Sequence, residues 1–138
     1  MPRRENRVSS KPFLVIIDDE ADIGDLITDV ATPRGFDVQA FTAADEAFQV
    51  LEKHPPQLIV MDLMMPGIDG VEMLRYLAQH AKKSKLCLIS GSDVTVLNSA
   101  RRLASAHGLN VIAVFEKPLD IFKLRETFDD IAKEFVGC

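Results

Sequence analysis

The sequence has no tryptophan, one tyrosine and only two cysteines in 138 residues, and it has no long apolar run. Cys87 lies in an apolar stretch and Cys138 is the last residue, so the pair does not make a disulfide framework. The apolar runs are far too short to cross a membrane, and the N-terminus lacks the apolar core of a secretion signal. We therefore expect a cytoplasmic protein that neither crosses nor binds a membrane.

A surplus of basic charge is also missing. The formal net charge is −5, and no basic stripe interleaves with aromatic residues, so we expect no nucleic-acid binding by this domain. With 47% hydrophobic and 27% charged residues, the chain fits one domain with a hydrophobic core. Residues 1–11 are polar and basic and are expected to form a disordered arm, which leaves residues 12–138 for the folded domain.

What the chain does have is a fivefold alternation of apolar runs and amphipathic segments. The apolar runs predict strands at 13–18, 37–41, 58–62, 86–90 and 111–115. The amphipathic segments predict helices at 21–33, 43–54, 69–81, 93–107 and 119–135. Strands and helices that alternate with short connections imply a parallel sheet covered by helices on both faces.

Acidic residues directly follow two of the predicted strands. Asp18 and Asp19 come after an apolar run that begins at Phe13, and Asp62 comes after the run that begins at Leu58. The carboxyl ends of parallel strands meet at one edge of a sheet, where ligands bind in such folds. Clustered carboxylates repel one another unless they share a cation or a proton. These strand ends therefore predict a site for a hard cation such as Mg²⁺.

Two more strand ends supply a lysine and a hydroxyl. Lys117 follows the fifth predicted strand and is fixed by Pro118, whose peptide bond we predict to be cis. Its ammonium suits a phosphoryl oxygen or a carboxylate. Ser90 ends the fourth strand and can donate to a phosphoryl oxygen. Together with the acids, they predict phosphoryl transfer to a carboxylate, with Asp62 attacking phosphorus in line.

These motifs resemble the response-regulator receiver domain of two-component signalling, the family of the chemotaxis regulator CheY. The resemblance covers residues 12–136. It rests on four fragments in order, which are Ile17–Glu20, Val60–Gly70, Ser90–Gly91 and Glu116–Pro118. It implies an α/β fold of the flavodoxin-like (βα)5 type, a doubly wound parallel sheet of five strands in the order 2-1-3-4-5.

The resemblance also implies a role for each site residue. Asp62 would be the phosphoacceptor, with a histidine kinase or a histidine phosphotransfer protein as the donor. The family's Mg²⁺ ligands fall on Asp19, Asp62 and the backbone carbonyl of Met64, with Asp18 acting through water. Ser90 and Lys117 would hold the phosphoryl oxygens. Such a domain catalyses only its own phosphorylation and dephosphorylation.

One position departs from the family pattern. The family often has an aromatic residue three positions before the lysine, as the partner of the hydroxyl residue in the activation switch, and here that position is Val114. Phe115 comes one residue later, so strand alternation predicts that it points to the opposite face. The family commonly signals to a downstream protein through its fourth helix, fifth strand and fifth helix. On this surface Leu119 and Phe122 lie off the apolar stripe of the last helix, and we expect a monomer or a phosphorylation-linked dimer.

The sequence is compatible with three functional hypotheses. The favoured one is a stand-alone receiver without an output domain, because the sequence ends just after the fifth predicted helix; the same residues also fit the N-terminal part of a longer regulator. A phosphohydrolase of the haloacid-dehalogenase type also uses an aspartate and Mg²⁺, but it needs a second aspartate two residues after the nucleophile, where this chain has Met64. A receiver-like docking module that works without phosphorylation is the third.

Overall fold

The structure of this chain is a computed structural model that describes residues 11–91 and 94–136. Within these residues five strands alternate with five α-helices. The strands are β1 (Phe13–Ile17), β2 (Asp37–Phe41), β3 (Leu58–Asp62), β4 (Lys85–Ser90) and β5 (Asn110–Glu116). The helices are α1 (Ala21–Ala31), α2 (Ala44–Lys53), α3 (Gly70–His80), α4 (Val94–Ala106) and α5 (Ile121–Val136).

The predicted elements are all present, with boundaries that differ by one or two residues. The predicted first helix ends earlier than expected, because Pro33 lies in a short 3-10 helix, Thr32–Arg34, that follows α1. The last helix begins later, at Ile121, since the Asp120 side chain accepts a hydrogen bond from the N–H of Phe122 at 2.9 Å and so caps it. Leu119 therefore precedes α5. The predicted arm up to residue 10 and the tail residue Cys138 lie outside the described residues.

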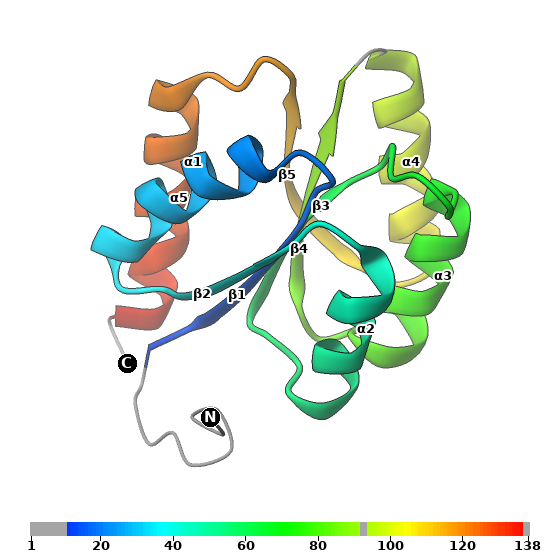
Figure 1. Cartoon of the computed structure of the whole chain (residues 1–138), viewed down its shortest axis with the longest axis horizontal. Helices are drawn as coiled ribbons and strands as arrows, with labels where there is room; N and C mark the ends of the chain where they lie inside the picture. The colour runs from blue at the N-terminus through cyan, green and yellow to red at the C-terminus, as the bar shows by residue number, and fades with distance from the viewer. Residues whose placement is uncertain (1–10, 92–93, 137–138) are drawn as a thin grey trace.

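All five strands are parallel and form one sheet in the order β2-β1-β3-β4-β5, as predicted (Figure 1). Every residue of β1 and of β3 is buried, because these strands lie inside the sheet and are covered on both faces. The order places the carboxyl ends of β1 and β3 side by side, with β4 next to them. This arrangement brings the acidic residues at the ends of β1 and β3 together.

Each face of the sheet has its own hydrophobic core, because alternate residues of a strand point to opposite faces. One core joins β1 and β3 to α2, α3 and α4 through residues such as Val15, Met61 and Leu77. The other core joins the same strands to α1 and α5, with Phe128 from α5 packed edge-on against Phe36 at 5.6 Å between ring centroids. Figure 1 shows these two groups of helices on opposite sides of the sheet.

The helices of this domain are short. Over residues 11–91 and 94–136 we find no helix with the length and apolar character that a membrane span requires.

Candidate functional site

The end of β1 delivers Asp18 into the site and leaves Asp19 exposed. Asp18 is 2% exposed, whereas Asp19 and Glu20 are exposed. The Oδ1 atom of Asp18 accepts a hydrogen bond from the backbone N–H of Glu20 at 2.8 Å, which forms the turn that leads into α1. Side chains two residues apart share a direction in extended backbone. Asp18 and Glu20 accordingly point to the same region, where both contact Lys117.

The end of β3 places Asp62 beside Asp18. Asp62 is 2% exposed, and its Oδ1 atom accepts a hydrogen bond from the N–H of Met64 at 2.8 Å. The next residue, Leu63, donates its N–H to the carbonyl of Ile89 at 2.9 Å, so the strand pairing of β3 with β4 continues past Asp62. The loop then turns at Gly67, whose positive φ of 83° is open to glycine but strained for other residues.

Lys117 is the cation at the centre of this cluster. Its Nζ atom lies 3.0 Å from Asp62 Oδ2 and 3.2 Å from Asp18 Oδ2. It also lies 2.5 Å from Oε2 of Glu20. The backbone N–H of Lys117 donates to the carbonyl of Ser90 at 2.9 Å, and the Lys117–Pro118 peptide bond is cis, as predicted. One ammonium therefore contacts three carboxylates that come from two different strand ends.

Ser90 completes the set of residues predicted from the four strand ends. It is the last residue of β4 and has no exposed surface. Its Oγ atom has no hydrogen-bond partner among the residues that the structure describes. A buried hydroxyl without a partner costs free energy, so this group is available to a ligand oxygen.

Burial and charge shift the pKa values of two site residues in the same direction. Burial raises the pKa of Asp18 to about 6, since the charged carboxylate loses its hydration; the N–H of Glu20 opposes this rise and the charge of Asp62 adds to it. Burial lowers the pKa of Lys117, but its hydrogen bonds to Glu20 and Asp62 and the nearby carboxylate charges outweigh burial and raise it overall. The lysine is thus held in its charged form.

The chemistry of this cluster fits a divalent metal ion. One carboxylate oxygen from each of Asp18, Glu20 and Asp62 lies within 4.8 Å of the others, and oxygen donors of this kind are the ligands that Mg²⁺ prefers. The Oδ2 atom of Asp18 makes an ion pair with Lys117 at 3.2 Å but no hydrogen bond, so it can also accept a metal ion. Asp19 is not part of this group, so its assignment as a direct ligand stays a prediction.

Glu20 is the site residue that the sequence analysis missed. A usable signal was present, because Asp18 and Glu20 are two residues apart and should share one side of an extended segment. The prediction for Val114 and Phe115 is confirmed: Phe115 packs in the core beneath α1 and α5, and Val114 packs against the opposite core. The described residues therefore place no aromatic ring of β5 on the face where the family often has one.

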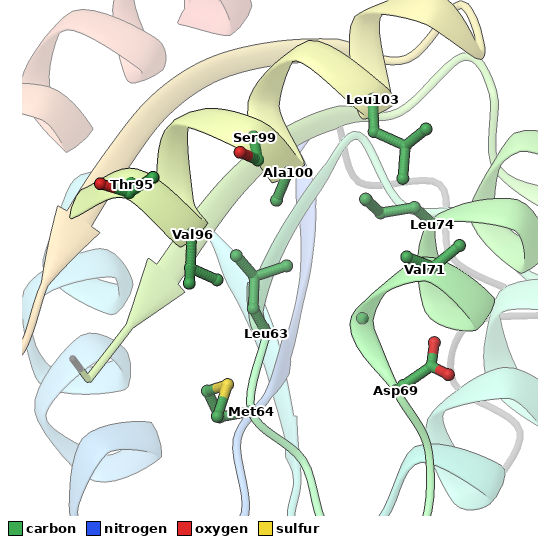
Figure 2. A pocket seen from close by; sticks show the side chains of 11 residues that line it. Leu63, Met64, Asp69, Val71, Leu74, Thr95, Val96, Ser99, Ala100 and Leu103 are labelled. Carbon is green, nitrogen blue, oxygen red and sulfur yellow. The ribbon is translucent and has the colours of Figure 1, made fainter. Parts of the chain in front are cut away.

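An apolar pocket of about 360 Å³ borders the acidic site, between α3 and α4. Figure 2 shows Val96 of α4 and Val71 of α3 on opposite sides of Leu63, with Met64 at the open end. Met64, Val71 and Val96 are each more than two-fifths exposed, at 58%, 42% and 43%. The pocket begins at Leu63 and Met64, on the loop that follows Asp62, so a change in that loop reaches the wall of the pocket.

Comparisons of the sequence and of the structure with known proteins both lead to response regulators. The sequence matches the profile of the response regulator receiver domain over residues 14–129. The crystal structure of a response regulator from Colwellia psychrerythraea is 37% identical, with a TM-score of 0.78, and the match covers 90% of this chain and 98% of that one.

Two curated relatives differ in how much of their length is matched. Sporulation initiation phosphotransferase F of Bacillus subtilis is 26% identical over 115 residues, which are 82% of this chain and 87% of that protein. Regulatory protein VanRc of Enterococcus gallinarum is 40% identical over 62 residues, 45% of this chain but only 27% of that protein. The matched segment likewise spans about a third of the length of further transcriptional regulators.

Proposed function

Since this chain belongs to the response-regulator receiver family, we propose that it is a phosphorylatable switch whose phosphoacceptor is Asp62. A receiver domain is a signalling module rather than a classical enzyme, and membership of the family implies a kinase or phosphotransfer partner. The observation that carries the proposal is the contact of the buried Asp62 carboxylate with Lys117, next to Asp18 and at the carboxyl end of the sheet.

In the proposed reaction, a carboxylate oxygen of Asp62 attacks the phosphorus of a phosphohistidine in line. The new O–P bond forms as the P–N bond to the donor imidazole breaks, and the imidazole nitrogen keeps the electron pair and takes up a proton. Lys117 then exchanges its contact with Asp62 for one with a phosphoryl oxygen, and the Ser90 hydroxyl donates to another. A bound Mg²⁺, held by Asp62 and its acidic neighbours, would supply positive charge for the transferring oxygens.

The output surface that we propose consists of α4, β5 and α5. Phe122, at the start of α5, is 74% exposed, which is unusual for a phenylalanine. Since Val114 replaces the aromatic residue of the family switch, we infer that movement of Ser90 is passed to this surface by the backbone of β4 and by α4, and not by a ring that turns inward.

The decisive experiment is intact-mass spectrometry after incubation with acetyl phosphate and Mg²⁺. We expect wild type to gain one phosphoryl group and Asp62→Asn to gain none, because the amide that replaces the carboxylate is not a nucleophile. Asp69→Asn is a suitable control, since Asp69 follows on the same loop but caps α3 through a 2.8 Å hydrogen bond from the N–H of Glu72. Equal phosphorylation of wild type and Asp62→Asn would contradict the assignment. No phosphorylation of either would favour the docking module.

A second prediction concerns the surface that meets the donor. Asp22, Asp25 and Asp29 form an exposed acidic row on α1, whose first turn follows the site. If this row faces a basic patch of the donor, changing all three to lysine should slow phosphotransfer from the cognate protein at least about tenfold at low salt, through a lower association rate. Phosphorylation by acetyl phosphate should change much less. Lysine at Asp45 and Glu46, which are exposed on α2, serves as the control.

If the triple variant accepts phosphoryl groups from the same histidine kinases as wild type, this acidic row does not take part in recognition of the donor. This result would leave the assignment of Asp62 untouched, because that assignment depends on the acetyl phosphate experiment.

A further inference from the structure

The side chain of Glu20 does not cap α1, although Glu20 is the residue at which this helix begins. Glu20 occupies the N-cap position of α1, with φ −90° and ψ 107°, but its side chain makes no capping hydrogen bond. Its carboxylate is 57% exposed and lies 2.5 Å from the Nζ atom of Lys117. An N-cap residue usually accepts a hydrogen bond from the first turn of its own helix. Here the acceptor is directed to the lysine of the site.

Glu20 differs from the other two carboxylates that contact Lys117. Asp18 and Asp62 are buried, and in the proposed function both are engaged once the site is loaded, Asp62 by the phosphoryl group and Asp18 near the metal ion. Glu20 is at the solvent-exposed opening of the site, near enough to Asp18 and Asp62 to share a metal ion with them, but its contact with Lys117 is not displaced by the phosphoryl group. It is therefore the carboxylate that remains available to hold the ammonium after phosphorylation.

We propose that Glu20 is a positioning residue that holds Lys117 and offsets part of its charge, which limits the attraction of the site for phosphoryl groups and small anionic donors. This inference rests on the proposed function and concerns the regulation of that same site. A negative charge at the opening repels an incoming anion, and an ion pair with Lys117 reduces the positive charge that the phosphoryl oxygens experience.

The consequence is a preference for protein donors. A small anionic donor such as acetyl phosphate depends on the local charge of the site for its binding. A phosphohistidine protein also gains binding free energy from contacts with the surface of the domain, so a single charge at the opening affects it less. Glu20 would thereby reduce unspecific phosphorylation by small metabolites that carry an activated phosphoryl group.

The experiment compares wild type with Glu20→Gln, which removes the charge but keeps an oxygen that can accept from Lys117. The probe is beryllofluoride, an anionic phosphoryl mimic, titrated by calorimetry at saturating Mg²⁺. We expect it to bind about three- to tenfold more tightly to Glu20→Gln at low ionic strength, and we expect acetyl phosphate to react faster by a similar factor. Both differences should shrink in high salt, because Glu20 is exposed and salt screens exposed charges.

Glu46→Gln is the matched control, since Glu46 is an exposed glutamate on α2 and does not contact Lys117. It should bind beryllofluoride like wild type. Glu20→Asp keeps the charge on a shorter side chain and should remain closer to wild type than Glu20→Gln does. The affinity for Mg²⁺ alone, measured in the same titrations, should change less than about tenfold, as expected for a charge near the ion and not for a lost ligand.

Beryllofluoride binding that is equal or weaker in Glu20→Gln would overturn the inference while leaving the role of Asp62 intact. A Mg²⁺ affinity that falls by more than about tenfold would also overturn it, since Glu20 would then act as a metal ligand. If wild type binds Mg²⁺ but neither binds beryllofluoride nor reacts with acetyl phosphate, the proposed function fails, and the inference fails with it.

Discussion

Replacing Lys117 with methionine should lower the free energy of unfolding of the metal-free protein by about 3–5 kcal/mol at pH 7, the usual cost of removing one partner of a buried ion pair. The ammonium of Lys117 lies 3.0 Å from Asp62 and 3.2 Å from Asp18, and both aspartates are 2% exposed. Without the ammonium these carboxylates face each other with no counter-charge. Methionine keeps the apolar stem, so the loss reports the charge. Urea unfolding in the presence of EDTA measures it.

The expected loss of stability agrees with the raised pKa of Lys117. Because that pKa is raised in the folded protein, the charged lysine stabilises the fold at every pH below the ordinary lysine value, and this contribution is lost only as the pH rises through the alkaline range. Lys83→Met is the control, since Lys83 is exposed after the end of α3. Addition of Mg²⁺ at a hundredfold excess over its dissociation constant should raise the free energy of unfolding of Lys117→Met by about 2.7 kcal/mol. Equal stability of wild type and Lys117→Met in EDTA would contradict the prediction.

Asp18→Asn should have the opposite effect and raise the stability of the metal-free protein at pH 7–8 by an amount on the order of 3 kcal/mol. Burial raises the pKa of Asp18 from 3.8 to about 6, so its charged form is less favourable in the folded protein than in the unfolded chain. Asparagine keeps an oxygen that can accept the N–H of Glu20 and removes the charge. Thermal or urea unfolding of both proteins in EDTA measures the difference.

The stability difference between wild type and Asp18→Asn should depend on pH. Between about pH 4 and 6 the folded state of wild type binds more protons at Asp18 than the unfolded state does, so wild type loses stability as the pH rises through this window. The variant lacks this loss. Its advantage should therefore be absent below pH 4 and complete above pH 6. Asp19→Asn alters the exposed neighbour and leaves Asp18 in place, so it should lose stability over the same window as wild type. An advantage that stays constant across the range would assign the effect to packing and not to charge.

Much of this site follows from the sequence because strand ends are easy to recognise. The apolar runs before Asp18, Asp62 and Ser90 mark buried strands, and the sheet order then brings their ends to one edge. The contact of Lys117 with both aspartates follows from the same geometry, although its distances do not. Sequence patterns locate strands well because burial on both faces requires continuous apolar residues.

What the sequence left open depends on side-chain directions in turns. Glu20 lies just beyond β1, where the chain bends into α1, and the hydrogen bond from its own N–H to Asp18 sets the direction of its side chain. The start of α5 was misplaced for a similar reason, since Asp120 can cap a helix from more than one register. Both features depend on local hydrogen bonds that periodicity does not encode.

The placement of the single tyrosine determines which optical signals this protein can give. The ring of Tyr76, on α3, stacks on Phe48 of α2 with 3.8 Å between ring centroids, and its hydroxyl donates to the carboxylate of Glu52, also on α2, with the carbonyl of Phe48 nearby at 3.1 Å. With no tryptophan in the chain, ultraviolet fluorescence reports the α2–α3 contact and not the acidic edge of the sheet. A tryptophan introduced at Val96, in the apolar pocket beside the loop that follows Asp62, would give the site a fluorescent reporter of its own.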